Sequence, residues 1–228
     1  MGADDVARED LHRERINCYI KGGICLKATI VLNGVSNGTM FITGEMLIAA
    51  DGGAEELRRR NLLPDVIIGD LDSISDESIE YFESKGVKIQ VYPHEKDETD
   101  LELAINYALK HGATEIEILN WQGERIDMIL AMIGLMSKYE NITAVADNCE
   151  IGVLSTGEHS LKAIRDETWS FIPLCEADFS ISGFKYKFDG KMSITSPIGV
   201  SNETFENNVK VNVRSGKVVY IRWKKRPL

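Results

Sequence analysis

The sequence predicts an α/β fold, in which a parallel-sheet α/β domain is followed by an antiparallel β-sandwich domain. Between residues 28 and 146, short apolar runs alternate with segments of helical period, which is the pattern of parallel strands joined by helices. After Glu150 this pattern stops, and short runs of alternating polarity follow one another between glycines, as in antiparallel sandwiches. Acidic residues follow several of the early runs, at the edge where open parallel sheets bind ligands.

Each expected element of the first half follows from its local pattern. The apolar runs predict strands at residues 28–32, 46–50, 66–68, 87–91, 116–119 and 142–146. The segments of helical period predict helices at residues 54–61, 76–85, 100–110 and 126–138. The third helix has the clearest signals, because Thr99 and Glu102 form a capping-box pattern before it and Gly112 follows it.

The second half predicts short strands, among them residues 169–173, 184–188 and 209–213. The boundary near Asp147 and Asn148 has no flexible linker, so we expect the two units to pack tightly. The resulting division is a polar N-terminal extension at 1–26, an α/β domain at 27–148 and a β-sandwich domain at 149–228.

Composition limits the possible partners. The net charge of −10 would repel a polyanion, which argues against nucleic acid. No apolar run approaches the roughly 20 residues of a membrane span, and the N-terminus is too charged for a signal peptide. The dispersed cysteines form no zinc motif and fit a reducing compartment; they are Cys18, Cys25, Cys149 and Cys175. We therefore expect a cytoplasmic protein with small-molecule ligands and no membrane partner.

The paired aspartates Asp70 and Asp72 follow the apolar run 66–68 directly. On an extended segment, side chains two residues apart share a face, so this pair can hold one divalent cation together with phosphate oxygens. A solvated turn without a ligand is the alternative interpretation. The sequence around the aspartate pair favours a metal site, because two more acidic segments follow later apolar runs and would lie along the same edge of the sheet.

Those two segments open the third and fourth helices. Lys96, Asp97 and Asp100 precede or begin the helix at 100–110, where acids can also serve simply as helix caps. Arg125 and Asp127 open the last helix; the arginine could neutralise phosphates, and the aspartate could orient a substrate. Because the chain has no Gly-x-x-x-x-Gly-Lys-Ser/Thr loop, phosphate binding would depend on metal and arginine.

Five ordered segments of this chain resemble the thiamine pyrophosphokinases, which transfer the diphosphate of ATP to the hydroxyl of thiamine. The resemblance extends from about residue 27 to residue 223. Its segments are Ala50-Asp51-Gly52-Gly53-Ala54, Pro64-Asp65 with Gly69-Asp70-Leu71-Asp72-Ser73, Lys96-Asp97-Glu98-Thr99-Asp100-Leu101-Glu102, Gly123 through Asp127, and Gly199-Val200-Ser201-Asn202-Glu203. The family combines an α/β catalytic domain with a thiamine-binding β-sandwich domain, in homodimers whose active site lies between subunits.

The resemblance also implies roles for individual residues. It implies that Mg²⁺ is bound by Asp70, Asp72, Asp97 and Asp100. It implies ATP contacts from Asp51, Gly52, Gly53, Lys96, Thr99 and Arg125, with the glycines keeping the loop narrow. Thiamine would be bound by Asp127, Ser201 and Asn202. The catalytic set would be Asp70, Asp72, Asp100, Arg125 and Asp127, with the general base unassigned.

Two positions depart from the family pattern of Gly-Gly-Arg-x-Asp-His (or Gln). This chain has Glu124 in place of the second glycine and Met128 in place of the last polar residue. Three interpretations therefore stay open at this point. They are a thiamine diphosphokinase, a diphosphokinase of the same fold acting on another alcohol such as a pterin or thiamine analogue, and a non-catalytic nucleotide- or thiamine-binding protein.

Overall fold

A computed structural model describes residues 26–35 and 40–224. The predicted N-terminal extension, apart from Leu26, lies outside the described residues, as do Cys18 and Cys25. Leu26 itself begins the first strand, β1 (Leu26–Val31). Within the described residues, no helix is both long enough and apolar enough to span a membrane.

The first half forms the parallel sheet that the sequence predicts. Its strands run in the order β6-β5-β1-β2-β3-β4, and every neighbouring pair is parallel. All six expected strands are confirmed, with boundaries shifted by a few residues at most. After β1 they are β2 (Met46–Ala50), β3 (Val66–Gly69), β4 (Lys88–Val91), β5 (Ala113–Leu119) and β6 (Ile142–Val145).

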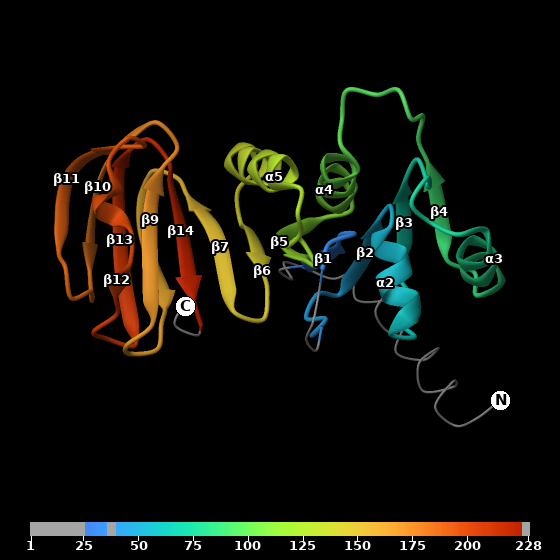
Figure 1. Cartoon of the computed structure of the whole chain (residues 1–228), viewed down its shortest axis with the longest axis horizontal. Helices are drawn as coiled ribbons and strands as arrows, with labels where there is room; N and C mark the ends of the chain where they lie inside the picture. The colour runs from blue at the N-terminus through green and yellow to red at the C-terminus, as the bar shows by residue number, and fades with distance from the viewer. Residues whose placement is uncertain (1–25, 36–39, 225–228) are drawn as a thin grey trace.

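Helices cover both faces of this sheet, and all four expected helices are confirmed. They are α2 (Gly53–Arg59), α3 (Asp76–Ser84), α4 (Asp100–Lys110) and α5 (Ile126–Lys138). α4 buries its apolar side on one face of the central strands, through Leu101, Ala104 and Ile105. α2 and α3 pack on the opposite face around Leu57 and Phe82. In Figure 1, α4 and α5 accordingly lie above the sheet.

The second half extends the same sheet. β7 (Cys149–Leu154) pairs antiparallel with β6, and the order continues through β14 (Val218–Trp223), β9 (Thr168–Pro173) and β12 (Asn202–Glu203), making a ten-stranded sheet. A separate four-stranded sheet has the order β11-β10-β13-β8, formed by β8 (Gly157–Lys162), β10 (Glu176–Ser182), β11 (Phe188–Ser193) and β13 (Asn208–Ser215). A core that includes Trp169, Phe171 and Phe179 consists of residues from both sheets, which confirms the sandwich.

One expected strand is wrong. Residues 184–188 were expected to form a strand, but β11 begins only at Phe188, and Phe184 makes an isolated bridge with Thr204. The side chain of Asn202 binds the backbone of Tyr186, with Oδ1 accepting from its N–H at 3.1 Å and Nδ2 donating to its carbonyl at 2.7 Å. The side-chain amide of Asn202 thus bonds the backbone where a neighbouring strand would. Residues 184–188 therefore do not form a strand despite their alternating polarity.

Candidate active site

Asp51 lies at the carboxyl end of β2, in a backbone conformation unusual for a non-glycine residue (φ 45°). Its N–H donates to the carbonyl of Ile68 at 2.8 Å, which fixes the turn against β3. The next residues must be small: a Cβ atom on Gly53 would lie 2.0 Å from the carbonyl oxygen of Val31. The close approach of two chain segments therefore requires the glycine here, whether or not a ligand is bound.

Asp70 and Asp72 follow β3, separated by Leu71 in the left-handed region (φ 66°). This conformation turns the two carboxylates into different surroundings. The side chain of Asp70 is 14% exposed and that of Asp72 is 57% exposed. Strained conformations of non-glycine residues are often retained at functional sites, and both Asp51 and Leu71 have one.

The loop after β4 brings Lys96 and Asp100 to the same edge. Thr99 caps α4 as expected, because its Oγ1 accepts from the N–H of Glu102 at 3.2 Å. The carboxylate of Glu102 accepts from Lys138 Nζ at 2.7 Å. The cap sets the position of Asp100, the first residue of the helix.

Carboxylate oxygens of Asp51, Asp70 and Asp100 lie within 4.8 Å of one another, and we call these residues the inner group. Lys96 Nζ lies 3.1 Å from Asp100 Oδ1 and 3.7 Å from Asp70 Oδ2. Burial raises the pKa of Asp100, and the nearby carboxylates of Asp51 and Asp70 raise it further, against the effect of Lys96. For Lys96, burial opposes the charged form, yet the carboxylates raise its pKa on balance.

The inner group fits a hard divalent cation. Asp51 Oδ1 is buried and has no hydrogen-bond partner among the described residues. A buried acceptor without a donor is costly, and a bound cation would satisfy it. Three carboxylates and one ammonium leave a formal charge of −2, which a divalent cation would neutralise.

A second set of possible ligands, the outer group, consists of Asp70, Asp72 and His94. Asp70 belongs to both groups, so it is the carboxylate that could link two neighbouring cations. His94 Nε2 lies 3.7 Å from Asp72 Oδ2. Asp97 was expected as a ligand, but it is exposed and lies in neither group of described residues.

Arg125 and Asp127 lie at the start of α5 and bind each other. Arg125 Nε donates to Asp127 Oδ1 at 2.9 Å, and Nη2 donates to Oδ2 at 2.6 Å. This hydrogen-bonded pairing lowers the pKa of Asp127 to about 2. Both side chains are largely exposed, at 74% and 63%, so the guanidinium is accessible to an anionic ligand.

Ser201 and Asn202 lie far from these residues within one chain. Asn202 begins β12, the first strand of the ten-stranded sheet, whereas β2 and β3 are the eighth and ninth. Figure 1 shows β12 and β3 toward opposite ends of the molecule. Asn202 is buried, and its amide binds the backbone of Tyr186, whereas Ser201 is exposed and has a φ of 61°.

The largest side chains near the last strand serve packing. Tyr220 is 6% exposed, stacks on Trp169 at 5.4 Å between ring centroids, and donates to Glu150 Oε1 at 2.9 Å. Its place on β14 is therefore explained by the sandwich core. Trp223, the other aromatic residue at this end of the chain, is only partly buried.

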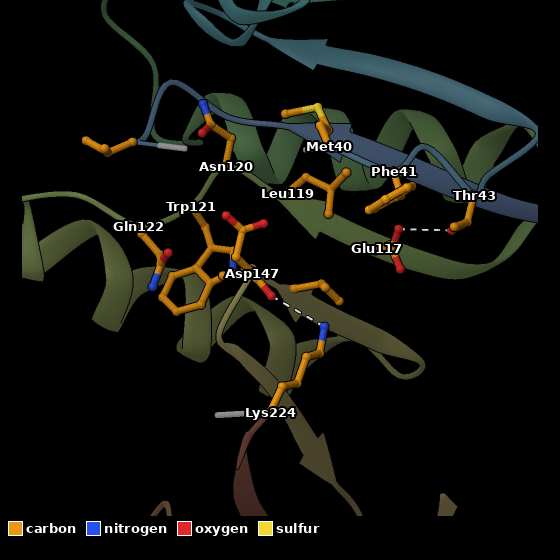
Figure 2. Close-up of a pocket in the computed structure, with 13 residues that line it drawn as sticks. Met40, Phe41, Thr43, Glu117, Leu119, Asn120, Trp121, Gln122, Asp147 and Lys224 are labelled. Carbon is orange, nitrogen blue, oxygen red and sulfur yellow. Dashed lines mark hydrogen bonds between the residues drawn. The ribbon is translucent and has the colours of Figure 1, made fainter. Parts of the chain in front are cut away.

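A cavity of about 280 Å³ lies near the carboxyl ends of β5 and β6 (Figure 2). Its lining combines apolar residues such as Leu119 and Val145 with polar ones such as Asn120 and Glu117. None of the predicted site residues lines it. Asn120 holds a positive φ of 57° and donates to the carbonyls of Leu32 and Gly34, so it joins the ends of β1 and β5.

Two family models match this chain in order. Residues 40–146 match the thiamin pyrophosphokinase catalytic domain, and residues 158–218 match the thiamin pyrophosphokinase vitamin B1 binding domain. This chain belongs to the thiamine pyrophosphokinase family. A thiamine pyrophosphokinase of Bacillus subtilis is 28% identical over 206 residues, covering 85% of this chain and 96% of that protein. Thiamine pyrophosphokinase 1 of Oryza sativa is 30% identical over 182 residues, covering 73% and 68%.

Solved structures of thiamine pyrophosphokinases have the same architecture. The crystal structure from Bacillus subtilis superposes with a TM-score of 0.76 at 25% identity, covering 88% of this chain and all of that one. The Candida albicans enzyme gives 0.72 at 20% identity, covering 87% and 89%, which supports the fold alone. Membership of the thiamine pyrophosphokinase family therefore agrees with the α/β domain and the sandwich described above.

The departures from the thiamine pyrophosphokinase pattern lie on the surface at the start of α5. Glu124 is exposed, and Met128 is 49% exposed. Neither side chain enters the inner group, so the proposed metal ligands are unaffected by these changes.

Proposed function

We propose that this chain transfers the diphosphate of ATP to the hydroxyl of thiamine, giving thiamine diphosphate and AMP. The observation that carries the proposal is the inner group, in which three carboxylates from separate segments converge beside Lys96. Membership of the thiamine pyrophosphokinase family supports the choice of reaction. A site with this excess of negative charge can bind a polyphosphate only through cations.

The roles we propose follow from the geometry. Asp51, Asp70 and Asp100 would hold one Mg²⁺, and Asp72 would hold a second cation on the outer side. When bound, Mg²⁺ would join the phosphate oxygens and offset the charge of the transferring group. Lys96 and Arg125 would bind phosphate oxygens. We propose that Asp97, Gly52, Gly53 and Thr99 also contact the nucleotide or support the loops that bind it.

The transfer is a substitution at the β-phosphorus of ATP. The thiamine hydroxyl oxygen forms the new bond to phosphorus, the bond from phosphorus to the oxygen bridging to the α-phosphate breaks, and AMP leaves with that oxygen. The hydroxyl proton passes to a base that the geometry does not identify. Asp127, with its pKa near 2, is a weak base, so we propose that it orients the thiamine side of the reaction. Catalysis would rest mainly on positioning and electrostatics.

The distance between the two halves of the site supports our proposal of a homodimer with the active site between subunits. Six strands separate β12 from β2 in the sheet. At about 4.8 Å per strand spacing, Asn202 and Asp51 are roughly 34 Å apart across one chain. A hydroxyl must come within about 3.5 Å of the phosphorus to react. If Ser201 and Asn202 bind thiamine, a second subunit must supply them to the carboxylates.

The first experiment measures AMP and thiamine diphosphate formed from ATP, Mg²⁺ and thiamine. We expect equal amounts of both products, and a loss of at least about 100-fold in the Asp72→Asn variant. Asp76→Asn is the matched control, because Asp76 is exposed in the first turn of α3 and lies in neither group. Folded protein that binds ATP but forms neither product would contradict thiamine as the acceptor.

The shared site has its own test. Asp72→Asn and Ser201→Trp proteins, each inactive alone, are mixed and allowed to exchange subunits. Random exchange makes half of the dimers mixed, and each mixed dimer has one intact site, so about a quarter of the wild-type activity should return. If the mixture stays inactive although subunit exchange is demonstrated, the site does not combine Asp72 and Ser201 from different subunits.

A further inference from the structure

Lys96 occupies an unusual place for a lysine. Its side chain is only 11% exposed, and its ammonium lies in contact with Asp100 and within 3.7 Å of Asp70. A half-buried ammonium with so little exposed side chain is stable only where carboxylates or carbonyls replace its lost hydration. Those carboxylates are the same ones that form the inner group.

The ammonium satisfies this group only in part. It contacts Asp100 and lies close to Asp70, while the buried Oδ1 of Asp51 has no hydrogen-bond partner among the described residues. One monovalent cation beside three carboxylates leaves two negative charges unbalanced. The Lys96 ammonium therefore partly neutralises the three carboxylates but does not satisfy all of their oxygens.

We propose that Lys96 is the resident counterion of the inner group and a positioning residue that couples metal binding to nucleotide binding. Without nucleotide, a divalent cation entering between Asp70 and Asp100 must displace the ammonium, and the displaced ammonium loses its partners. When ATP binds with the metal, a phosphate oxygen replaces the carboxylates as the partner of the Lys96 ammonium. This inference deepens the proposed function and rests on it, because it needs the inner group to bind a divalent cation.

The local structure allows this exchange. Lys96 Nζ also donates to the carbonyl of Pro93 at 3.2 Å, so part of its hydrogen bonding comes from its own loop. A lysine ammonium on a four-carbon stem can move while its backbone stays in place. Thr99 and the first turn of α4 hold Asp100 independently of Lys96. The carboxylates can therefore keep their positions while the ammonium turns toward a phosphate.

The test measures Mn²⁺ affinity by electron paramagnetic resonance, with and without the non-hydrolysable analogue AMP-CPP in place of ATP. We expect Lys96→Met to bind Mn²⁺ at least tenfold more tightly than wild type without nucleotide. We also expect the analogue to increase Mn²⁺ affinity much less in this variant than in wild type. Lys96→Arg, which keeps the charge, should behave like wild type. Lys110→Met, at the exposed end of the same α4, is the matched control.

The outcomes separate this inference from the proposed function. Equal Mn²⁺ affinity in wild type and Lys96→Met, or weaker affinity in the variant, would overturn the role of Lys96 while leaving the metal site intact. No Mn²⁺ binding in any folded variant, with or without nucleotide, would overturn the proposed metal site together with the inference. Thermal unfolding of each variant shows that it is folded.

Discussion

Replacing Glu167 with glutamine should reveal how strongly one buried ion pair supports the sandwich. The Glu167 side chain is 6% exposed and accepts from Arg222 Nε at 3.0 Å and Nη2 at 2.9 Å. It also accepts from the backbone of Ile164 and from Trp169 Nε1. The backbone carbonyl of Glu167 accepts from the N–H of Thr204, the residue that follows β12. The carboxylate thus connects Trp169 of β9 with Arg222 of β14, and the main chain of Glu167 connects to the segment that carries Ser201 and Asn202.

The expected loss is about 3 kcal/mol in the free energy of unfolding, at the lower end of the range for breaking a buried ion pair. We choose the lower end because Glu150 Oε2 still lies 3.6 Å from Arg222 Nη1. For a chain of this size, about 3 kcal/mol corresponds to a fall in Tm of roughly 6–12 °C. Glu176→Gln is the control, because that pair with Lys191 is about two-thirds exposed and should change Tm by less than about 3 °C.

The effect should depend on pH in a defined direction. Burial tends to raise the pKa of Glu167, but the hydrogen bonds from Arg222 and Ile164 outweigh it, so the pKa is lowered in the folded protein. The ionised carboxylate therefore stabilises the fold above its unfolded pKa of about 4.3, and this contribution is lost as the pH falls through the folded pKa. The Tm difference between wild type and Glu167→Gln, measured by calorimetry, should shrink below about pH 4. An unchanged Tm at pH 7 would refute the reasoning.

Three further predictions concern the first half. Gly53→Ala should lower the free energy of unfolding by about 1–3 kcal/mol, because the new Cβ atom would meet a backbone carbonyl. Gly134→Ala, in the open middle of α5, should raise the free energy of unfolding by about 0.5–1 kcal/mol. Denaturant unfolding compares the two variants. Thr99→Ala should cost about 1 kcal/mol in the same assay, and Thr99→Ser should restore most of it. Arg125→Met should raise the pKa of Asp127 from about 2 toward 3.9 in an NMR titration, and an unmoved pKa would contradict the pairing.

The helices and the parallel strands could be predicted because their signals are local. An apolar run of three to five residues, or an apolar stripe bounded by a cap such as Thr99, depends only on residues that are close in the sequence. Residues 184–188 are different, because their structure depends on a distant residue. Their alternating polarity is that of a strand, yet the bonds that decide their structure come from Asn202, some 16 positions along the chain.

The candidate site was predictable to a similar extent. Residues that follow parallel strands must meet at one edge, so the convergence of Asp51, Asp70 and Asp100 follows from the order of motifs and strands. Which oxygens face one another does not follow from it. The turn at Leu71 separates Asp72 from the inner group, and Asp97 belongs to neither group, because loop conformation decides which carboxylates come together.

The sequence by itself determined the fold class, the elements of the α/β half and the kinds of residue at its carboxyl edge, because periodicity and chain order carry that information. Only the tertiary structure decided that β6 and β7 join both halves into one sheet, and that Ser201 and Asn202 consequently lie far from the carboxylates of their own chain. It also decided that the ammonium of Lys96 lies beside the carboxylates of Asp70 and Asp100. Such features depend on strand pairing and side-chain direction between distant residues, which no local pattern specifies.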